Sequence, residues 1–124
     1  MPGSLVGRLV LVVEDEPLVA LHLQDFLERA GARVLLAHEL ATARVQAHHP
    51  ELAAAVLDHG LKQEDSSEIC TILKKRHIPF VIYSGYSNVH GDCAEAELVH
   101  KPAPPQVLVA TLASVLAEQR ASLN

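Results

Sequence analysis

Short apolar runs alternate with longer amphipathic stretches along this chain. Leu9 to Val13 is a continuous apolar run rich in valine, which is the pattern of a strand buried on both faces of a parallel sheet. Pro17 suits the first turn of a helix, and apolar residues then recur at helical spacing until Gly31. The pattern therefore predicts a strand that is followed by a helix.

The same alternation continues through the rest of the chain. Strands are predicted at residues 33–37, 52–57, 80–83 and 98–100, and helices at residues 39–48, after residue 65 and from residue 104 or 105 onward. Because each crossover returns the chain across the sheet in the same direction, such strands pair in parallel. We expect an α/β fold with a five-stranded parallel sheet and helices on both faces. One domain would span residues 9–120, with tails at residues 1–8 and 121–124.

Composition and charge narrow the classes of function. A chain of 124 residues with 49% hydrophobic and 20% charged residues has the size and make-up of one globular domain. Its formal net charge of -5 argues against direct binding of nucleic acid. No apolar run reaches the roughly 18 to 20 residues of a membrane span, and no signal-type segment opens the chain, so we expect a cytoplasmic protein. We interpret Cys70 and Cys93 as small buried or incidental thiols and assign them no role.

Polar residues follow the predicted strands at the edge of the sheet where ligands bind in this class of fold. They are Glu14 and Asp15 after the first strand, Asp58 after the third, Ser84 after the fourth and Lys101 after the fifth. Three carboxylates oppose one another's ionisation unless a cation lies among them, and hard oxygen ligands suit Mg²⁺. With Mg²⁺ bound, Asp58 could act as a nucleophile toward a phosphoryl group whose oxygens contact Ser84 and Lys101.

These residues lie in motifs that resemble a known family. VLVVEDEP, AAVLDHGL, VIYSG and VHKP stand in the order and spacing of the acidic-pair, phosphoacceptor, hydroxyl and lysine motifs of response-regulator receiver domains, the phospho-accepting modules of two-component signalling. The resemblance covers Leu9 to about Leu116. It implies a flavodoxin-like sheet with strand order 2-1-3-4-5.

The resemblance also implies a role for each residue of the site. It implies that Glu14, Asp15, Asp58 and the backbone carbonyl of Gly60 bind Mg²⁺, that Asp58 is phosphorylated, that Ser84 senses the phosphoryl group, that Lys101 pairs with it, and that the bond before Pro102 is cis.

The chain departs from the common receiver pattern in two places. The position three before Lys101, usually a switch aromatic in this family, is Leu98, so no aromatic ring can report phosphorylation there. The span from Ser84 to Lys101 is roughly a helical turn or more shorter than in common receivers, so we expect the fourth helix to be short or irregular. The stretch IPFVIYSGYS partly resembles the PF-x-F-A-T-G signature of the single-domain "FAT GUY" receivers of alphaproteobacteria, which lack the same aromatic.

Two further residues are candidate modulators of the phosphoryl site. Tyr86 follows Ser84 by two positions, where its ring could cover the site and limit the entry of water. His59 is next to Asp58, where it could affect access or protonation. For both residues the alternative is an ordinary loop side chain.

Three functions remain open from the sequence. The first is a switch in which Asp58 takes a phosphoryl group from a histidine kinase or a histidine phosphotransfer protein and changes a protein-binding surface around residues 84–101. Its output could run through a protein partner, through a phosphate relay or sink, or through the rest of a longer protein such as a hybrid histidine kinase. The second is a Mg²⁺-dependent phosphatase or phosphotransferase, although Gly60 stands where a second acid is usual. The third is a docking module that is not phosphorylated.

Overall fold

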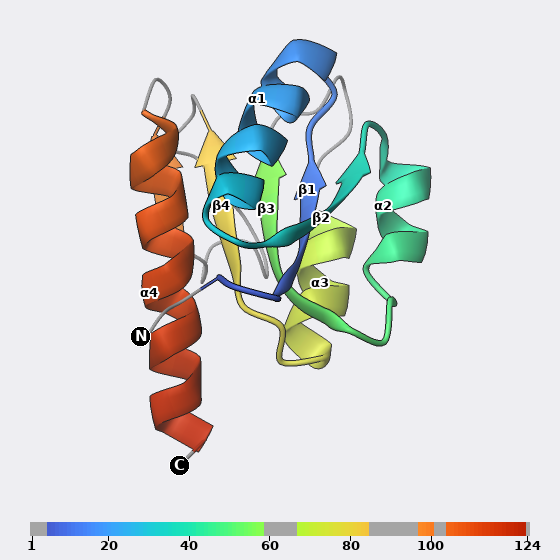
Figure 1. The fold of residues 1–124 in the computed structure, drawn as a ribbon. Coiled ribbons are helices and arrows are strands. Elements are labelled where there is room, and N and C mark those ends of the chain that lie inside the picture. The colour runs from blue at the N-terminus through green and yellow to red at the C-terminus, as the bar shows by residue number, and fades with distance from the viewer. Residues whose placement is uncertain (1–4, 59–66, 85–96, 101–103, 124) are drawn as a thin grey trace.

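A parallel sheet covered by helices forms the architecture of the protein (Figure 1). The computed structural model describes residues 5–58, 67–84, 97–100 and 104–123. The strands lie in the order β2-β1-β3-β4-β5, and all neighbouring strands are parallel. This finding confirms the parallel α/β fold that the sequence predicts.

The strands are β1 (Leu9–Val13), β2 (Arg33–Ala37), β3 (Leu52–Asp58), β4 (Phe80–Ser84) and β5 (Glu97–His100). The helices of the described residues are α1 (Pro17–Arg29), α2 (Leu40–Gln46), α3 (Ser67–Lys75) and α4 (Pro105–Leu123).

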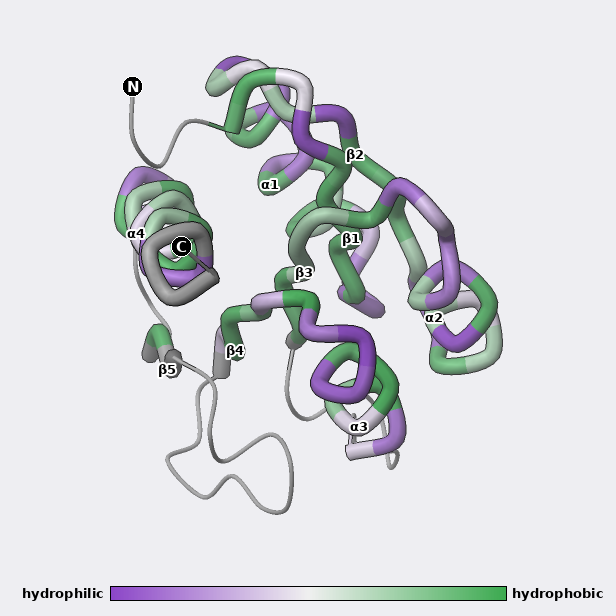
Figure 2. The backbone as a smooth tube through the Cα atoms, turned by 90° about the horizontal axis from the view of Figure 1, so that it is seen from below, coloured by the Kyte–Doolittle hydropathy of each residue, from purple (hydrophilic) through white to green (hydrophobic). Residues whose placement is uncertain are grey.

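The central strand β1 is buried along its whole length, as its unbroken apolar run predicts. Successive side chains of a strand point to opposite faces, and the structure divides them in this way. Leu9, Leu11 and Val13 pack in one layer of the core with side chains of α2 and α3. Val10 and Val12 pack in the other layer with side chains of α1 and α4. Figure 2 shows α1 and α4 on one side of the sheet and α2 and α3 on the other.

Helix α1 ends in a Schellman motif built around Gly31. The N–H of Gly31 donates to the carbonyl of Glu28 at 2.9 Å, and the N–H of Ala32 donates to the carbonyl of Leu27 at 3.0 Å. Gly31 has a φ of 97°, in the left-handed region that favours glycine. The helix stop predicted at Gly31 therefore follows from the backbone conformation that this turn requires.

The segment before β1 packs on the core. Leu5 is only 3% exposed and lies in the layer that contains α1 and α4. The N–H of Gly7 donates to the carbonyl of Gly31 at 2.9 Å, and the N–H of Arg33 donates to the carbonyl of Arg8 at 2.8 Å. Packing thus begins before Leu9, where the sequence pattern places the start of the domain.

Helix α3 ends in a second Schellman motif, with a histidine in the left-handed position. His77 has a φ of 58°, and the N–H of Ile78 donates to the carbonyl of Leu73 at 2.9 Å. The preceding residue, Arg76, donates from one guanidinium nitrogen to the carbonyls of Ala47 at 2.6 Å and His49 at 3.1 Å. This arginine therefore satisfies carbonyls at the end of α2 and ties α3 to it.

The interpretation of Cys70 as a small buried or incidental thiol is right about burial and wrong about the thiol. This residue is fully buried on α3 and is disulfide-bonded. The other cysteine of the chain, Cys93, lies outside the described residues, as does the segment 85–96 where a short or irregular fourth helix is expected. None of the helices in the described ranges is long and apolar enough to cross a membrane.

We expect Gly31→Ala to destabilise the protein by about 2 kcal/mol or more. An alanine here must adopt a positive φ, which costs roughly 1–2 kcal/mol, and its Cβ would lie 2.7 Å from Cγ2 of Val6. Urea unfolding measures the loss. Gly7→Ala is the matched control, because Gly7 has a φ of 75° but its added Cβ would meet nothing within 4 Å. Equal losses in the two variants would contradict a role for the close approach of Val6.

Candidate functional site

The carboxyl ends of β1, β3 and β4 lie next to one another at one edge of the sheet, which we call the carboxyl edge. Val13 pairs with Leu57, so the next residues, Glu14 and Asp58, lie at matching positions on the two neighbouring chains. Adjacent strands are about 4.8 Å apart, so the backbones of these two acidic residues are close neighbours. Asp58 pairs in turn with Tyr83, directly before Ser84. The register of the strands therefore brings the backbones of Glu14, Asp58 and Ser84 to a common edge.

Glu14 is the first residue after β1 and is held in place on several sides. Its side chain is buried, with 1% relative exposure. Its Oε2 accepts the N–H of Glu16 at 3.3 Å, and its own N–H donates to the carbonyl of Ala37 at the end of β2 at 2.9 Å. Glu14 thus closes the turn between β1 and α1 as well as presenting a carboxylate at the carboxyl edge.

Negative charge is concentrated at this turn. Asp15 is half-buried, and Glu16, the N-cap residue of α1, is exposed. Because α1 begins at Pro17, the positive end of its helix dipole faces these carboxylates and offsets part of their mutual repulsion, by roughly 0.3–1 kcal/mol each. The remaining repulsion would be relieved by a bound cation.

The donor chemistry of this edge fits Mg²⁺. Glu14 and Asp15 supply hard carboxylate oxygens, and Asp58 stands at the end of the adjacent strand. Within the side chains that the structure describes, no three His, Cys, Asp or Glu residues form a group that could hold a metal ion. A complete ligand set therefore needs donors besides Glu14 and Asp15, and Asp58 and Gly60 are the ones that the sequence predicts.

Several residues of the predicted site lie outside what the structure describes. For Asp58 and Ser84 the backbone is described and the side chain is not, and Leu98 has the same status in β5. The others lie outside the described residues altogether: His59, Gly60, Tyr86, Lys101 and Pro102. Their roles stay predictions.

His38 belongs to the carboxyl edge and was missed by the sequence analysis. It follows β2 directly, and its Nδ1 lies 3.1 Å from the carbonyl oxygen of Glu14. The signal was present, because the second strand also ends at this edge.

A shallow groove of about 320 Å³ lies between the start of α1 and the start of α4. It is lined by Leu18, Val19, His22, Leu23, Tyr83 and Pro105. Among the described side chains of these two helices, the large exposed apolar ones are Leu18, Leu21 and Val107, by 76%, 56% and 45%, and we call them the apolar rim. Of these, Leu18 lines the groove. Since Tyr83 pairs with Asp58, this groove is close to the carboxyl edge.

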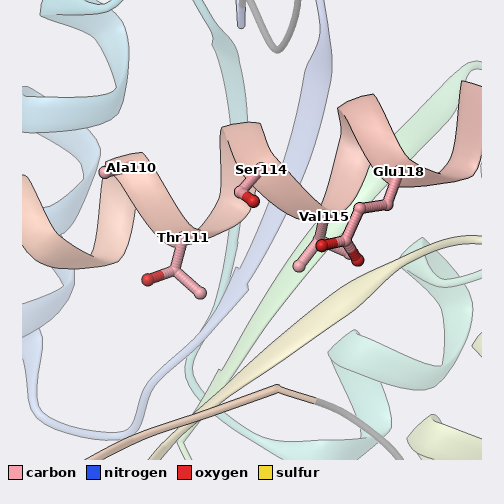
Figure 3. Close-up of a pocket in the computed structure, with 5 residues that line it drawn as sticks. All are labelled: Ala110, Thr111, Ser114, Val115 and Glu118. Atoms are coloured by element: carbon pink, nitrogen blue, oxygen red, sulfur yellow. The ribbon is translucent and has the colours of Figure 1, made fainter.

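A second pocket, of about 330 Å³, lies along α4 and is drawn in Figure 3. Its lining residues, Ala110, Thr111, Ser114, Val115 and Glu118, all come from this one helix. The hydroxyl of Thr111 donates to the carbonyl of Val107 at 2.8 Å, so it is committed to the helix backbone. With Glu118 as its one ionisable group, this pocket lacks the converging charges of the carboxyl edge.

Comparison with known proteins identifies the fold. No protein-family model and no curated protein matches the sequence. Solved structures match closely in shape: a CheY-like response regulator receiver domain protein from Methanospirillum hungatei JF-1 has a TM-score of 0.83 at 20% identity, over 94% of this chain and 98% of that one. The response regulator PhyR from Brucella abortus has a TM-score of 0.81 at 21% identity, over 98% of this chain and 52% of that one. A sensor protein from Polaromonas sp. JS666 has a TM-score of 0.76 at 24% identity, over 90% of this chain and 98% of that one.

The chain has the fold of response-regulator receiver domains. The "FAT GUY" subgroup stays a prediction.

We expect Asp15→Asn to remove the stabilisation of the protein by Mg²⁺ and to raise the melting temperature in metal-free buffer. The substitution removes one of the crowded negative charges and one predicted metal ligand. Binding to the folded state alone is worth about 2.7 kcal/mol at 100 times Kd, and the variant should lose this gain. Thermal unfolding in EDTA and in Mg²⁺ measures both effects. Glu16→Gln, which removes a neighbouring exposed charge, should keep the response to Mg²⁺. Loss of that response in both variants would contradict a specific role for Asp15.

Proposed function

We propose that this chain, which has the fold of response-regulator receiver domains, is a signalling switch that accepts a phosphoryl group on Asp58. The observation that carries the proposal is the register of β1 on β3, which sets the turn with buried Glu14 and half-buried Asp15 beside the end of the strand that carries Asp58. Clustered carboxylates in this position are costly for the fold alone, and they suit a cation site that supports phosphoryl chemistry.

The proposed reaction is one displacement at phosphorus. A carboxylate oxygen of Asp58 attacks the phosphorus of a phosphohistidine, the new P–O bond forms as the P–N bond breaks, and the released imidazole takes up a proton. Mg²⁺ held by Glu14, Asp15, Asp58 and the carbonyl of Gly60 would neutralise charge on the phosphoryl oxygens. The Lys101 ammonium and the Ser84 hydroxyl would hold further oxygens of the same group.

We infer that the phosphoryl donor is a protein, such as a histidine kinase or a histidine phosphotransfer protein. The support is the exposed apolar rim on α1 and α4, of which Leu18 lines the groove next to the carboxyl edge. A small phosphodonor would not cover these side chains, whereas a protein docked over the site would bury them. The same position would bring the phosphohistidine of the donor near Asp58.

The output of the switch is proposed to be a change of the protein-binding surface around residues 84–101. Of this surface, the structure describes only Ser84 and β5. Output through a phosphate relay, or as one domain of a longer protein, is a second form of the same proposal. The similarity to PhyR from Brucella abortus supports the form with a longer protein, because the matched region is 52% of that chain.

Incubation with acetyl phosphate and Mg²⁺ should add about 80 Da to the intact protein, and Asp58→Asn should abolish the addition. A phosphorylated aspartate that accumulates to near-stoichiometric level is expected of a switch, since the carboxylate is the only acceptor required. Intact-protein mass spectrometry measures the adduct. Sustained release of phosphate without an accumulated adduct would instead favour the Mg²⁺-dependent phosphatase, and an adduct that persists in Asp58→Asn would contradict the assignment of the acceptor.

Leu18→Asp should slow phosphotransfer from a histidine phosphotransfer protein by about 10-fold or more, and labelling by acetyl phosphate should stay unchanged. Placing a charge in the buried centre of an interface typically costs well over 1.4 kcal/mol, which is tenfold in affinity. Val45→Asp is the matched control, because Val45 is 75% exposed but lies on α2, on the opposite face of the sheet. If both variants or neither variant slows the transfer, the apolar rim is not the docking surface.

A further inference from the structure

We propose that His38 is a positioning residue for the metal-binding acidic pair, acting through the backbone of Glu14. The inference rests on the proposed function, because it assigns the histidine to the Mg²⁺ site described there. His38 is exposed at the end of β2 and lies 24 positions along the chain from Glu14. The sequence pattern predicts no role for this residue.

The contact is a hydrogen bond of defined direction. The Nδ1 atom of His38 is 3.1 Å from the carbonyl oxygen of Glu14. A carbonyl oxygen can only accept, so the imidazole must carry its proton on Nδ1. The neighbouring backbone supports the same alignment, because the N–H of Glu14 donates to the carbonyl of Ala37 at 2.9 Å. Residues 37 and 38 therefore hold both backbone polar groups of Glu14.

The planarity of the peptide bond passes this restraint to Asp15. The carbonyl of Glu14 and the N–H of Asp15 belong to one rigid peptide unit. When His38 holds the carbonyl oxygen, it also sets the direction in which the chain enters Asp15. The side chain of Glu14 cannot supply this restraint by itself, since its Oε2 is bound to the N–H of Glu16 on the far side of Asp15. The contacts of His38 and of the Glu16 N–H lie on either side of Asp15. They restrict its conformations before a cation binds, so less conformational entropy would be lost on binding.

Within the described part of the chain, the hydrogen bond to Glu14 is the contact that His38 makes through its ring. Its ring is exposed, so it is not a core side chain. Its Nδ1 faces the carbonyl oxygen of Glu14. Its remaining contribution is to orient the turn that carries the carboxylates.

The test compares His38→Ala, His38→Asn and the control His48→Ala by titration calorimetry with Mg²⁺. The amide nitrogen of asparagine is as many bonds from the backbone as Nδ1 of histidine, so it can donate to the same carbonyl. His48 is an exposed histidine after α2 and is remote from the carboxyl edge. We expect His38→Ala to weaken Mg²⁺ binding by about 3- to 10-fold, the range for one hydrogen bond. His38→Asn should stay within about twofold of the wild type, and His48→Ala should be unchanged.

The outcomes separate this inference from the proposed function. If the wild type does not bind Mg²⁺, the proposed function fails and His38 has no site to position. If the wild type binds and His38→Ala binds equally well, the positioning role alone is overturned. Equal weakening in His38→Ala and His38→Asn would also overturn it, since restoring the donor would have had no effect. Nitrogen-15 chemical shifts of the ring give a check that needs no metal, and a neutral His38 protonated only on Nε2 would contradict the hydrogen bond.

Discussion

The register of β1 on β3, which brings acidic residues of two strand ends to one edge of a parallel sheet, is the constraint on which the rest of the candidate site depends. The pairing of Val13 with Leu57 starts Glu14 and Asp58 from the same level of adjacent strands, and Asp15 follows at once. Like charges that lie close together repel one another, and the amino end of α1 offsets only part of this repulsion. The proposed cation would offset the part of this repulsion that remains.

The scaffold around this edge is rigid for physical reasons that can be traced to individual strands. All five residues of β1 are buried between two layers of helices, so β1 cannot shift without exposing apolar surface on both faces. The turn after it is then closed by three hydrogen bonds. Glu14 accepts from the N–H of Glu16 and from the ring of His38, and its own N–H donates to the carbonyl of Ala37. The rest of the described site is built on strand ends, and strand ends inherit the register of the sheet. Function at this edge therefore depends on packing far below it.

Much of the fold could be predicted because its signals are local. The apolar run of β1 and the bounds of β2 agree with the residues expected, and Gly31 ends α1 as its position in the pattern indicates. Other features carried no such signal. His77 takes the left-handed position at the end of α3 although glycine is usual there, and Leu5 packs on the core from a segment that reads as a tail. Cys70 is disulfide-bonded, and the sequence around a single cysteine in a helix does not indicate whether it forms a disulfide.

By itself the sequence determined the alternation of strands and helices, the parallel class of the sheet and the acidic residues that follow β1 and β3, because periodicity and strand ends are properties of short segments. The strand order follows the one that the resemblance to receiver domains implies. The tertiary structure decided the register between neighbouring strands, that Glu14 is buried rather than exposed, and that His38 reaches its carbonyl from 24 positions away. These features depend on the register between separate strands. Register is set by the packing of whole layers of side chains, and no short stretch of sequence contains it.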